Sequence, residues 1–333
     1  MSLMAMEAAE APQAVARFLA HNAAALEDLG ARLRRAPPTV VLTCARGSSD
    51  NAAGYFKYLC EITTGVPCAS VGASVVSVYG ARLKAEGALC LTISQSGQSP
   101  DIVALQQAAK VAGALTVALV NVADSPAARN ADICLELHAG TERSVAATKS
   151  FITSCAAAAA IVAQWSGDAA LLGAVARLPE SLQQAVRISW PGFTDFARDA
   201  ASLFVLGRGP AYPIAQETAL KLKETCAIHA EAYSVAEVMH GPWELMETDF
   251  PVLIYAPDDA ARDNTAAAAA KMRATGAAVS VVGDDLPFAS TGHPLLDPMS
   301  MIATAYLEIE RVAQALGRDP DRPRLLKKVT ETT

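Results

Sequence analysis

One pattern occurs twice in each half of this sequence: an apolar strand runs into a polar loop, and a helix starts directly after the loop. Gly47 and Gly209 occupy the same place in this pattern and lie 162 residues apart, as do Ser94 and Ala256. A constant offset of this length indicates a duplicated unit, much larger than a solenoid repeat. The four copies of the pattern cover residues 39–65, 88–113, 201–230 and 250–276.

Each unit alternates strands with helices, which predicts a parallel sheet covered by helices. The first unit contains two further apolar strands, at residues 114–126 and 131–140, and alanine-rich helices follow at 144–165 and 171–185. We therefore expect an α/β fold with two doubly wound parallel sheets. Ligands of such sheets bind beyond the carboxyl ends of the strands, which is where the polar loops of both units are expected.

The same pattern predicts how the chain is divided. A chain of 333 residues accommodates two domains. The expected parts are an N-terminal helix at 1–36, a first domain at 37–185, a second domain at 186–316 and a C-terminal tail at 317–333.

Charge and cysteine content narrow the classes of partner. The net charge of −7 opposes a nucleic-acid surface, which needs a basic patch, but it permits a local anion pocket. None of the seven cysteines forms a C-x-x-C pair, which indicates reduced thiols in a cytosolic protein. Histidines, cysteines and carboxylates show no ligand spacing, so we expect neither a metal nor a redox cofactor.

Targeting and membrane signals are the next consideration. The N-terminus lacks the basic and apolar regions of a signal peptide, so a cytoplasmic location is expected. The longest uncharged run, residues 150–167, has the length of a membrane span. Because Ala, Ser, Thr and Gln dominate it, we interpret it as a buried core helix, and we expect no contact with a membrane.

The loop SQSGQSPD, residues 94–101, has the composition of a phosphate site. Ser99 is a good helix N-cap and Pro100 suits the first helical position. A helix N-terminus favours an anion, and Gly97 lets the backbone approach a ligand. Three serine hydroxyls, at 94, 96 and 99, add donors. A plain capped turn with solvated serines is the alternative interpretation of this loop.

Several segments together resemble the sugar-isomerase (SIS) family, and more closely the isomerase half of the glutamine–fructose-6-phosphate aminotransferases. These segments are RGSSDN, SQSGQSPD, TERSVAATKSF, LGRGPAYPIAQETALKLKETCAIHAEAYSVAEVMHGP and DPDRPRLLKKVTETT. The resemblance runs from about residue 40 to the C-terminus. It implies two SIS domains, each a five-stranded parallel sheet between helices, with a phosphosugar bound at the first.

The resemblance also implies which residues contact the sugar phosphate. Ala147 departs from the family, whose VAST motif reads VAAT here, and the lost hydroxyl should shift substrate preference. The implied contacts are Ser49, Ser94, Gln95, Ser96 and Ser99, with backbone help near Val145.

Glu217, Lys221 and Glu224 are spaced i, i+4 and i+7, which places them on one face of a helix. A solvent-exposed Glu–Lys pair with a neighbour is the alternative. An aldose–ketose interconversion needs a base to move a proton between C1 and C2 of an open-chain sugar. We assign this step to Glu224, with Lys221 polarising the carbonyl oxygen or orienting Glu224, and with Glu217 steering Lys221.

Two further residues receive roles from the resemblance. The histidine that matches His240 opens the sugar ring and reaches across a dimer interface, which implies a homodimer. The lysine that matches Lys328 attacks the ketose carbonyl as a Schiff base, within a tail that folds over the sugar. The neighbouring Lys327 would help to lower the pKa of such a nucleophile, and Arg324 and Lys327 alternatively hold the tail down.

The expected reaction depends on a domain, the glutaminase domain, for which the sequence leaves no room. The full synthase begins with a glutaminase domain, whereas the first SIS repeat starts here within about 40 residues. We therefore expect an isomerising deaminase that converts glucosamine 6-phosphate and water to fructose 6-phosphate and ammonia. The alternatives are another 6-phosphosugar amine as substrate (galactosamine or fructosamine 6-phosphate), a plain phosphosugar isomerase, or a non-catalytic sugar-phosphate sensor.

Overall fold

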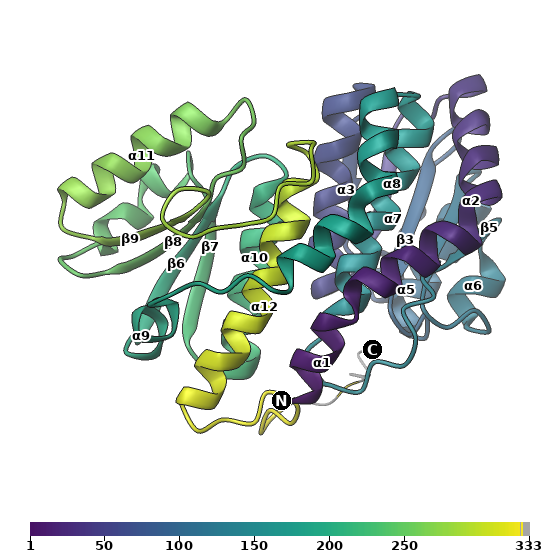
Figure 1. The fold of residues 1–333 in the computed structure, drawn as a ribbon. Helices are drawn as coiled ribbons and strands as arrows, with labels where there is room; N and C mark the ends of the chain where they lie inside the picture. The colour runs from purple at the N-terminus through teal and green to yellow at the C-terminus, as the bar shows by residue number, and fades with distance from the viewer. Residues whose placement is uncertain (327, 329–333) are drawn as a thin grey trace. The chain divides into compact units, whose positions relative to one another are not determined.

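The structure, a computed structural model, describes residues 1–326 and residue 328, and Lys327 lies outside the described residues. It contains two compact units, each with one parallel sheet (Figure 1). The five-stranded unit comprises Gln13–Glu142 and Lys149–Ala176. The four-stranded unit comprises Met1–Pro12, Arg143–Thr148 and Arg177–Lys328. Two parallel sheets flanked by helices confirm the predicted fold class.

The sheet of the five-stranded unit has the order β2-β1-β3-β4-β5, with all neighbours parallel. The chain steps from β1 out to β2 in one direction and from β3 to β5 in the other. The topological switch point therefore falls between β1 and β3, beside the loops that follow these two strands. The strands are β1 (Val41–Cys44), β2 (Cys68–Ser70), β3 (Leu89–Ser94), β4 (Leu115–Val120) and β5 (Ile133–Glu136).

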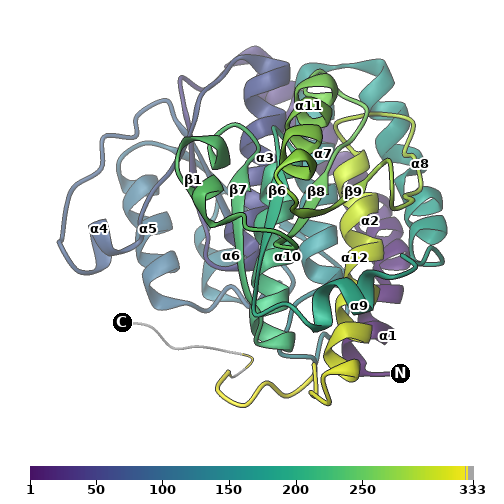
Figure 2. The same cartoon turned by 90° about the vertical axis from the view of Figure 1, so that its left-hand side faces the viewer.

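Helices cover both faces of this sheet, because right-handed crossovers in opposite directions place helices on opposite sides. Helix α3 (Ser48–Thr64) packs against α7 (Lys149–Ser166). Helices α4 (Ser74–Ser77), α5 (Pro100–Val111) and α6 (Pro126–Asn130) pack in sequence on one another (Figure 2). The five-stranded unit also contains most of the long helix α2 (Ala11–Arg35), from Gln13 on, and the first part of α8 (Ala169–Ala185), up to Ala176.

The uncharged run of residues 150–167 lies in α7, and nearly every side chain of this helix is buried. This confirms the interpretation as a core helix. In the part of the chain that the structure describes, we find no helix with both the length and the apolarity that a membrane crossing requires. All seven cysteines are free thiols and all but Cys134 are buried, in line with the expected reduced thiols.

The sheet of the four-stranded unit has the order β7-β6-β8-β9, again all parallel. Helix α11 (Arg262–Ala274) covers one face, and α10 (Ala211–Lys221) packs with α12 (Asp297–Ala315) on the other (Figure 1). Two short helices, α1 (Leu3–Ala9) and α9 (Phe193–Arg198), pack against α12. The strands are β6 (Ser202–Gly207), β7 (His229–Ser234), β8 (Pro251–Tyr255) and β9 (Ala278–Val282).

The duplication is visible in the structure. Strands β3 and β8 begin 162 residues apart, and so do helices α5 and α11. The order β2-β1-β3-β4 of the first sheet matches β7-β6-β8-β9 of the second. Sequence periodicity therefore identified the repeat correctly.

The expectation of five strands in each sheet is wrong for the second sheet, which has four strands among the described residues. After β9 the chain turns at Gly283–Asp285, and Leu286 forms only an isolated bridge with Val282. Pro287 and Pro294 follow, and proline has no backbone N–H to donate to a strand ladder. The chain instead leads as a loop into α12.

The expectation of one helix within residues 1–36 is also wrong, because the segment forms α1 and α2. Ser2 caps α1, since its hydroxyl accepts from the Ala5 N–H at 3.1 Å. Pro12 interrupts the helix after Glu10, because proline lacks the donor and its ring clashes with the preceding turn. The two helices have separate roles, and α1 belongs to the four-stranded unit.

Candidate active site

The serine loop, residues 94–99, connects β3 to α5 as a tight turn. The Ser94 hydroxyl accepts from the Gly97 N–H at 3.0 Å, and the Ser96 hydroxyl accepts from the Gln98 N–H at 3.3 Å. Gly97 has a φ of +63°, and a side chain there would overlap Ser125. Glycine is therefore required both by backbone conformation and by space. Gln95 lies half-buried in the same turn, and its carbonyl accepts from the Asn121 N–H.

Ser99 is the N-cap of α5 and Pro100 occupies its first turn, as the sequence predicts. The Ser99 side chain, however, makes no capping hydrogen bond. Helix α3 likewise begins after Gly47, without a side-chain cap, and places Ser49 in its first turn. A plain capped turn would use the Ser99 hydroxyl on its own helix. Two helix N-termini with serines therefore lie next to the switch point of this sheet, an arrangement that suits an anion.

Arg46 and Asp101 form an ion pair that joins the loops after β1 and β3. The Asp101 side chain is 2% exposed, whereas that of Arg46 is 49% exposed. The other Asp101 oxygen, Oδ1, accepts from the Ile102 N–H at 2.9 Å. An unpaired carboxylate in the first turn of α5 would repel a phosphate, and the Arg46 guanidinium offsets this charge. Sequence patterns do not reveal this pair, because Arg46 and Asp101 lie 55 residues apart.

The segment of residues 143–148, which carries Val145 and Ala147, is a loop in the four-stranded unit. A helix was expected from residue 144, but α7 starts at Lys149. The reason is a cap supplied by Glu142, whose carboxylate accepts from the Ser150 N–H at 3.1 Å and from its hydroxyl at 2.6 Å. Val145 and Ala147 are both half-buried.

Lys328 contacts this loop, because its Nζ donates to the Ser144 carbonyl oxygen at 2.7 Å. The Val145 N–H donates to the Asp321 carbonyl oxygen at 3.4 Å. The structure thus brings Lys328 next to the loop of Val145 and Ala147. The Ser144 hydroxyl is fully buried and has no hydrogen-bond partner among the described residues.

Glu217, Lys221 and Glu224 form one cluster, as their spacing predicts. Lys221 Nζ lies 2.5 Å from Glu224 Oε2 and 3.5 Å from Glu217 Oε1. Glu217 and Lys221 are buried, at 0% and 1% exposure, whereas Glu224 is 22% exposed. The alternative interpretation, a solvent-exposed Glu–Lys pair, is therefore wrong. Glu217 also accepts from the Tyr306 hydroxyl of α12 at 3.0 Å, a partner that spacing within one helix does not reveal.

Glu224 lies in a π-helical turn, Leu222–Cys226, that continues α10. Such turns are rare and frequent at functional sites, because they displace one side chain from the regular helix face. The Thr225 hydroxyl donates to the Lys221 carbonyl at 2.8 Å, and Ala227 ends the turn with a φ of +52°. Of the three clustered side chains, Glu224 is the one that is partly exposed to solvent.

His240 ends a 3-10 turn, Val238–His240, and its side chain is exposed. Its backbone N–H donates to the Glu237 carbonyl at 2.9 Å. Within the described residues, no hydrogen bond or ion pair joins the His240 ring to Glu217, Lys221 or Glu224. The ring-opening role that the resemblance implies for His240 therefore stays a prediction.

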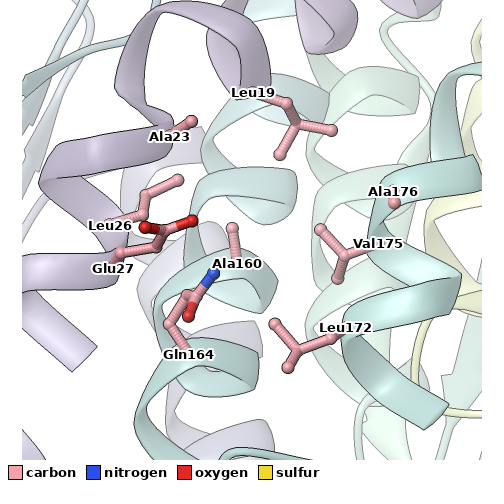
Figure 3. Close-up of a pocket in the computed structure, with 9 residues that line it drawn as sticks. All are labelled: Leu19, Ala23, Leu26, Glu27, Ala160, Gln164, Leu172, Val175 and Ala176. Atoms are coloured by element: carbon pink, nitrogen blue, oxygen red, sulfur yellow. The ribbon is translucent and has the colours of Figure 1, made fainter. Parts of the chain in front are cut away.

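The cavity in Figure 3 is a different feature of the five-stranded unit, with a volume of about 160 Å³. Helices α2, α7 and α8 line it with mainly Leu, Val and Ala side chains, and the polar groups are those of Glu27 and Gln164. A carboxylate in an apolar lining opposes a phosphate, and none of the predicted site residues lies here. We therefore assign no substrate role to this cavity.

Comparison with known proteins gives consistent matches. The model of the SIS domain matches residues 37–164 and 197–286. The chain is 33% identical over 318 residues to the glutamine–fructose-6-phosphate aminotransferase [isomerizing] of Thermotoga maritima, covering 89% of this chain and 52% of that protein. The Escherichia coli enzyme of the same name is 32% identical, covering 98% of this chain and 58% of that protein. The chain thus spans about half the length of these curated relatives.

Solved structures match in the same way. A proposed phosphosugar isomerase from Silicibacter pomeroyi is 46% identical, with a TM-score of 0.93, covering 96% of this chain and all of that one. The C-terminal domain of the aminotransferase from Francisella tularensis is 27% identical, with a TM-score of 0.85, covering 97% and 98% of the two chains. Similarity in sequence and similarity in fold therefore indicate the same group of proteins.

Proposed function

Because the chain belongs to the SIS-domain family, we propose that it acts on a phosphosugar, and that its reaction is an isomerising deamination. Glucosamine 6-phosphate and water would give fructose 6-phosphate and ammonia. The relatives at about 30% identity are named for an isomerising reaction of fructose 6-phosphate, which supports this substrate class.

The buried Glu217–Lys221–Glu224 cluster carries this proposal. A sensor needs donors for the sugar phosphate but has no need of two carboxylates held on one buried lysine. Burying this lysine costs free energy, which the two carboxylates and their hydrogen bonds offset. Such an arrangement is typical of an acid–base site, in which a carboxylate must give and take a proton at a fixed position.

In the proposed mechanism, the serine loop and the N-termini of α3 and α5 bind the phosphate. His240 assists ring opening by moving a proton between the anomeric hydroxyl and the ring oxygen. Glu224 then removes the C2 proton of the open-chain amino sugar and returns it to C1. In the same conversion the C1 carbonyl oxygen gains a proton and the C2 amine loses one, so that C1 becomes an alcohol and C2 an imine. Lys221 lies on Glu224 and stabilises the negative charge that develops between these steps.

Release of nitrogen follows at C2. The Lys328 amine adds to the C2 imine and ammonia leaves, so that a Schiff base links Lys328 to the ketose. Water then adds to this Schiff base and the C2–Nζ bond breaks, which regenerates the lysine and gives fructose 6-phosphate. The contact of Lys328 with the loop of Val145 and Ala147 supports a position beside the sugar.

A second substrate within the same class is favoured by Ala147. At this position the resembling family carries a hydroxyl that would contact the sugar. Its loss opposes strict selection of glucosamine and favours another 6-phosphosugar amine, such as galactosamine or fructosamine 6-phosphate. The reaction steps at C1 and C2 change with the substrate, but the phosphate site stays the same.

We include a homodimer and a cytoplasmic location in the proposal. The exposed position of His240 supports a role for this histidine in the site of a second subunit. Gel filtration with light scattering would test the dimer, and a fully active monomer would refute it.

The test is to incubate the protein with glucosamine, galactosamine and fructosamine 6-phosphates and to follow ammonia and fructose 6-phosphate. Ammonia from one of them identifies the substrate. Interconversion of phosphosugars without ammonia would leave a plain isomerase, and tight binding without any turnover would leave a sensor. Fructose 6-phosphate with glutamine is the further assay, because formation of glucosamine 6-phosphate there would indicate a synthase.

A further inference from the structure

Helix α1 (Leu3–Ala9) has an unusual connection to the loop of residues 143–148. The carboxylate of Glu7 accepts from two consecutive backbone N–H groups of this loop, that of Arg143 at 2.5 Å and that of Ser144 at 3.1 Å. The Glu7 side chain is 6% exposed. A buried carboxylate with two backbone donors makes strong, charge-assisted hydrogen bonds, and it fixes the direction of the peptide that it binds.

The other end of α1 is bound by the C-terminal tail. The two carboxylate oxygens of Asp321 accept from the first N–H groups of the helix, those of Leu3 and Met4, each at 2.7 Å. Ser2 adds a further contact, because its hydroxyl lies 2.7 Å from the Glu310 carboxylate of α12. Asp321 therefore supplies the cap that the start of α1 needs, from a position 318 residues away in the sequence.

These contacts connect three segments of the four-stranded unit with one another: α1, the loop of residues 143–148 and the C-terminal tail. Asp321 binds α1 through its side chain and binds the Val145 N–H through its carbonyl oxygen. Lys328, seven residues further along the tail, donates to the carbonyl of Ser144, whose N–H is bound to Glu7. The loop and the tail thus contact one another directly and are both attached to α1.

We propose that Glu7 and Asp321 are positioning residues, which act through α1 to hold the sugar-contacting loop and the tail that carries Lys328 in one fixed arrangement. This inference rests on the proposed function, in which loop and lysine meet the same sugar. Neither carboxylate touches the substrate in this scheme. Their effect is to reduce the freedom of the groups that do.

The number of acceptor oxygens on residues 7 and 321 can be changed without changing the size of the side chains. A carboxylate presents two equivalent oxygens, whereas the amide of Gln or Asn presents one oxygen and one NH₂ group. Glu7→Gln and Asp321→Asn preserve the size of the side chain. Each, however, places an NH₂ donor against one of the two backbone N–H groups, and that N–H group loses its acceptor. The two substitutions should therefore loosen the loop and the tail without emptying the space that they fill.

The first measurement does not depend on activity. The tail contains Arg318 and Arg324 as trypsin sites. We expect Glu7→Gln and Asp321→Asn to accelerate cleavage at these two sites by about tenfold, the equivalent of one lost hydrogen bond to a charged group. Glu180→Gln is the control, since Glu180 is exposed on α8. In the double variant the acceleration should be less than the product of the two, because both act through one helix.

The second measurement follows the chemistry. With fructose 6-phosphate and a borohydride reductant, the Schiff base at Lys328 is trapped as a stable adduct that mass spectrometry locates. We expect the trapping rate to fall by about tenfold in both variants, and the exchange of the C1 proton by Glu224 to change less. A merely structural role would lower both in proportion to the loss of folded protein, which thermal melting of each variant measures.

Three outcomes separate the possible failures. Unchanged tail cleavage in both variants would overturn the positioning role, whatever the protein catalyses. Accelerated cleavage with no adduct in the unmodified protein would support the attachment of the tail to α1 and would refute the proposed function of Lys328. Accelerated cleavage with an unchanged trapping rate would also overturn the inference, since the tail would then be held without consequence for the lysine.

Discussion

The loops after β3 and β8 occupy equivalent places in the two sheets, yet their chemistry is opposite. In the first, the Ser99 hydroxyl makes no capping bond, and the cation Arg46 comes from another loop. In the second, Arg262 at the start of α11 donates to the Ala256 carbonyl and pairs with Asp284 of the turn after β9, so both groups that its guanidinium binds belong to the four-stranded unit. The comparison shows that duplication preserved the backbone twice, whereas the donors for an anion are available in one copy.

The acidic groups of the second loop strengthen this contrast. Asp259 Oδ1 accepts from the Ala261 N–H at 2.8 Å, and burial raises the pKa of this carboxyl above its usual range. Asp258 lies beside it and is exposed. The start of α11 thus carries two carboxyl groups, and one of them already accepts from the Ala261 N–H. Both features oppose phosphate binding there. This supports phosphate binding in the five-stranded unit and proton transfer in the four-stranded unit.

The largest expected effect tests that division of roles. Glu224→Gln keeps the shape of the side chain but removes the base, so turnover should fall by at least about 10²-fold, in the range of general base catalysis. Binding of fructose 6-phosphate should change little, because the phosphate contacts lie elsewhere. Kinetics and calorimetry measure the two effects, with exposed Glu247→Gln as the control. Full activity of Glu224→Gln would refute the assignment.

A smaller effect is expected from the two arginines. Arg46→Gln leaves the buried Asp101 carboxylate unpaired, so affinity for fructose 6-phosphate should fall by about 10- to 100-fold. Arg262→Gln removes the arginine that is paired at the start of α11, and this variant should lower the melting temperature but leave affinity unchanged. The double variant Arg46→Gln with Asp101→Asn should recover part of the affinity, as measured by calorimetry. Equal losses of affinity in both single variants would contradict the difference between the loops.

Ser99 and Ala261 provide a matched pair, because they are the N-caps of α5 and α11. Loss of a capping serine normally costs about 1 kcal/mol of stability. Since the Ser99 side chain does not cap, Ser99→Ala should change the free energy of unfolding by less than about 0.5 kcal/mol and weaken phosphosugar binding by about tenfold. Ala261→Ser should create no new binding. Denaturant titration and calorimetry distinguish a cap from a ligand contact.

The smallest effect concerns the cavity of Figure 3. Ala176→Leu adds apolar volume beside Leu172 and Val175, and should raise the free energy of unfolding by about 0.5–1 kcal/mol without changing phosphosugar affinity. Thermal melting with and without fructose 6-phosphate measures both. A large loss of affinity would mean that this cavity, and not the serine loop, communicates with the substrate.

Local patterns in the sequence were sufficient to predict the repeat, most strands and the start of α5. These features depend on hydrophobic periodicity and on glycine or proline at fixed places, both of which are short-range properties. The spacing of Glu217, Lys221 and Glu224 likewise predicted their proximity. The predictions were wrong at α1, at the start of α7 and in the second sheet. A short helix gives too little periodicity to recognise, and a run of residues with two prolines ended the sheet.

Periodicity and residue spacing in the sequence are enough to define a duplicated α/β chain with one serine-rich loop and one helix that carries Glu217, Lys221 and Glu224 on the same face. Three contacts appear only in the folded chain: Glu217 accepts from Tyr306, and Arg46 pairs with Asp101. In the third, Glu7 binds the loop of residues 143–148 while Asp321 of the tail binds the start of α1. The physical reason is that each of these contacts joins residues tens to hundreds of positions apart. Their energies depend on burial and direction, which only the folded chain defines.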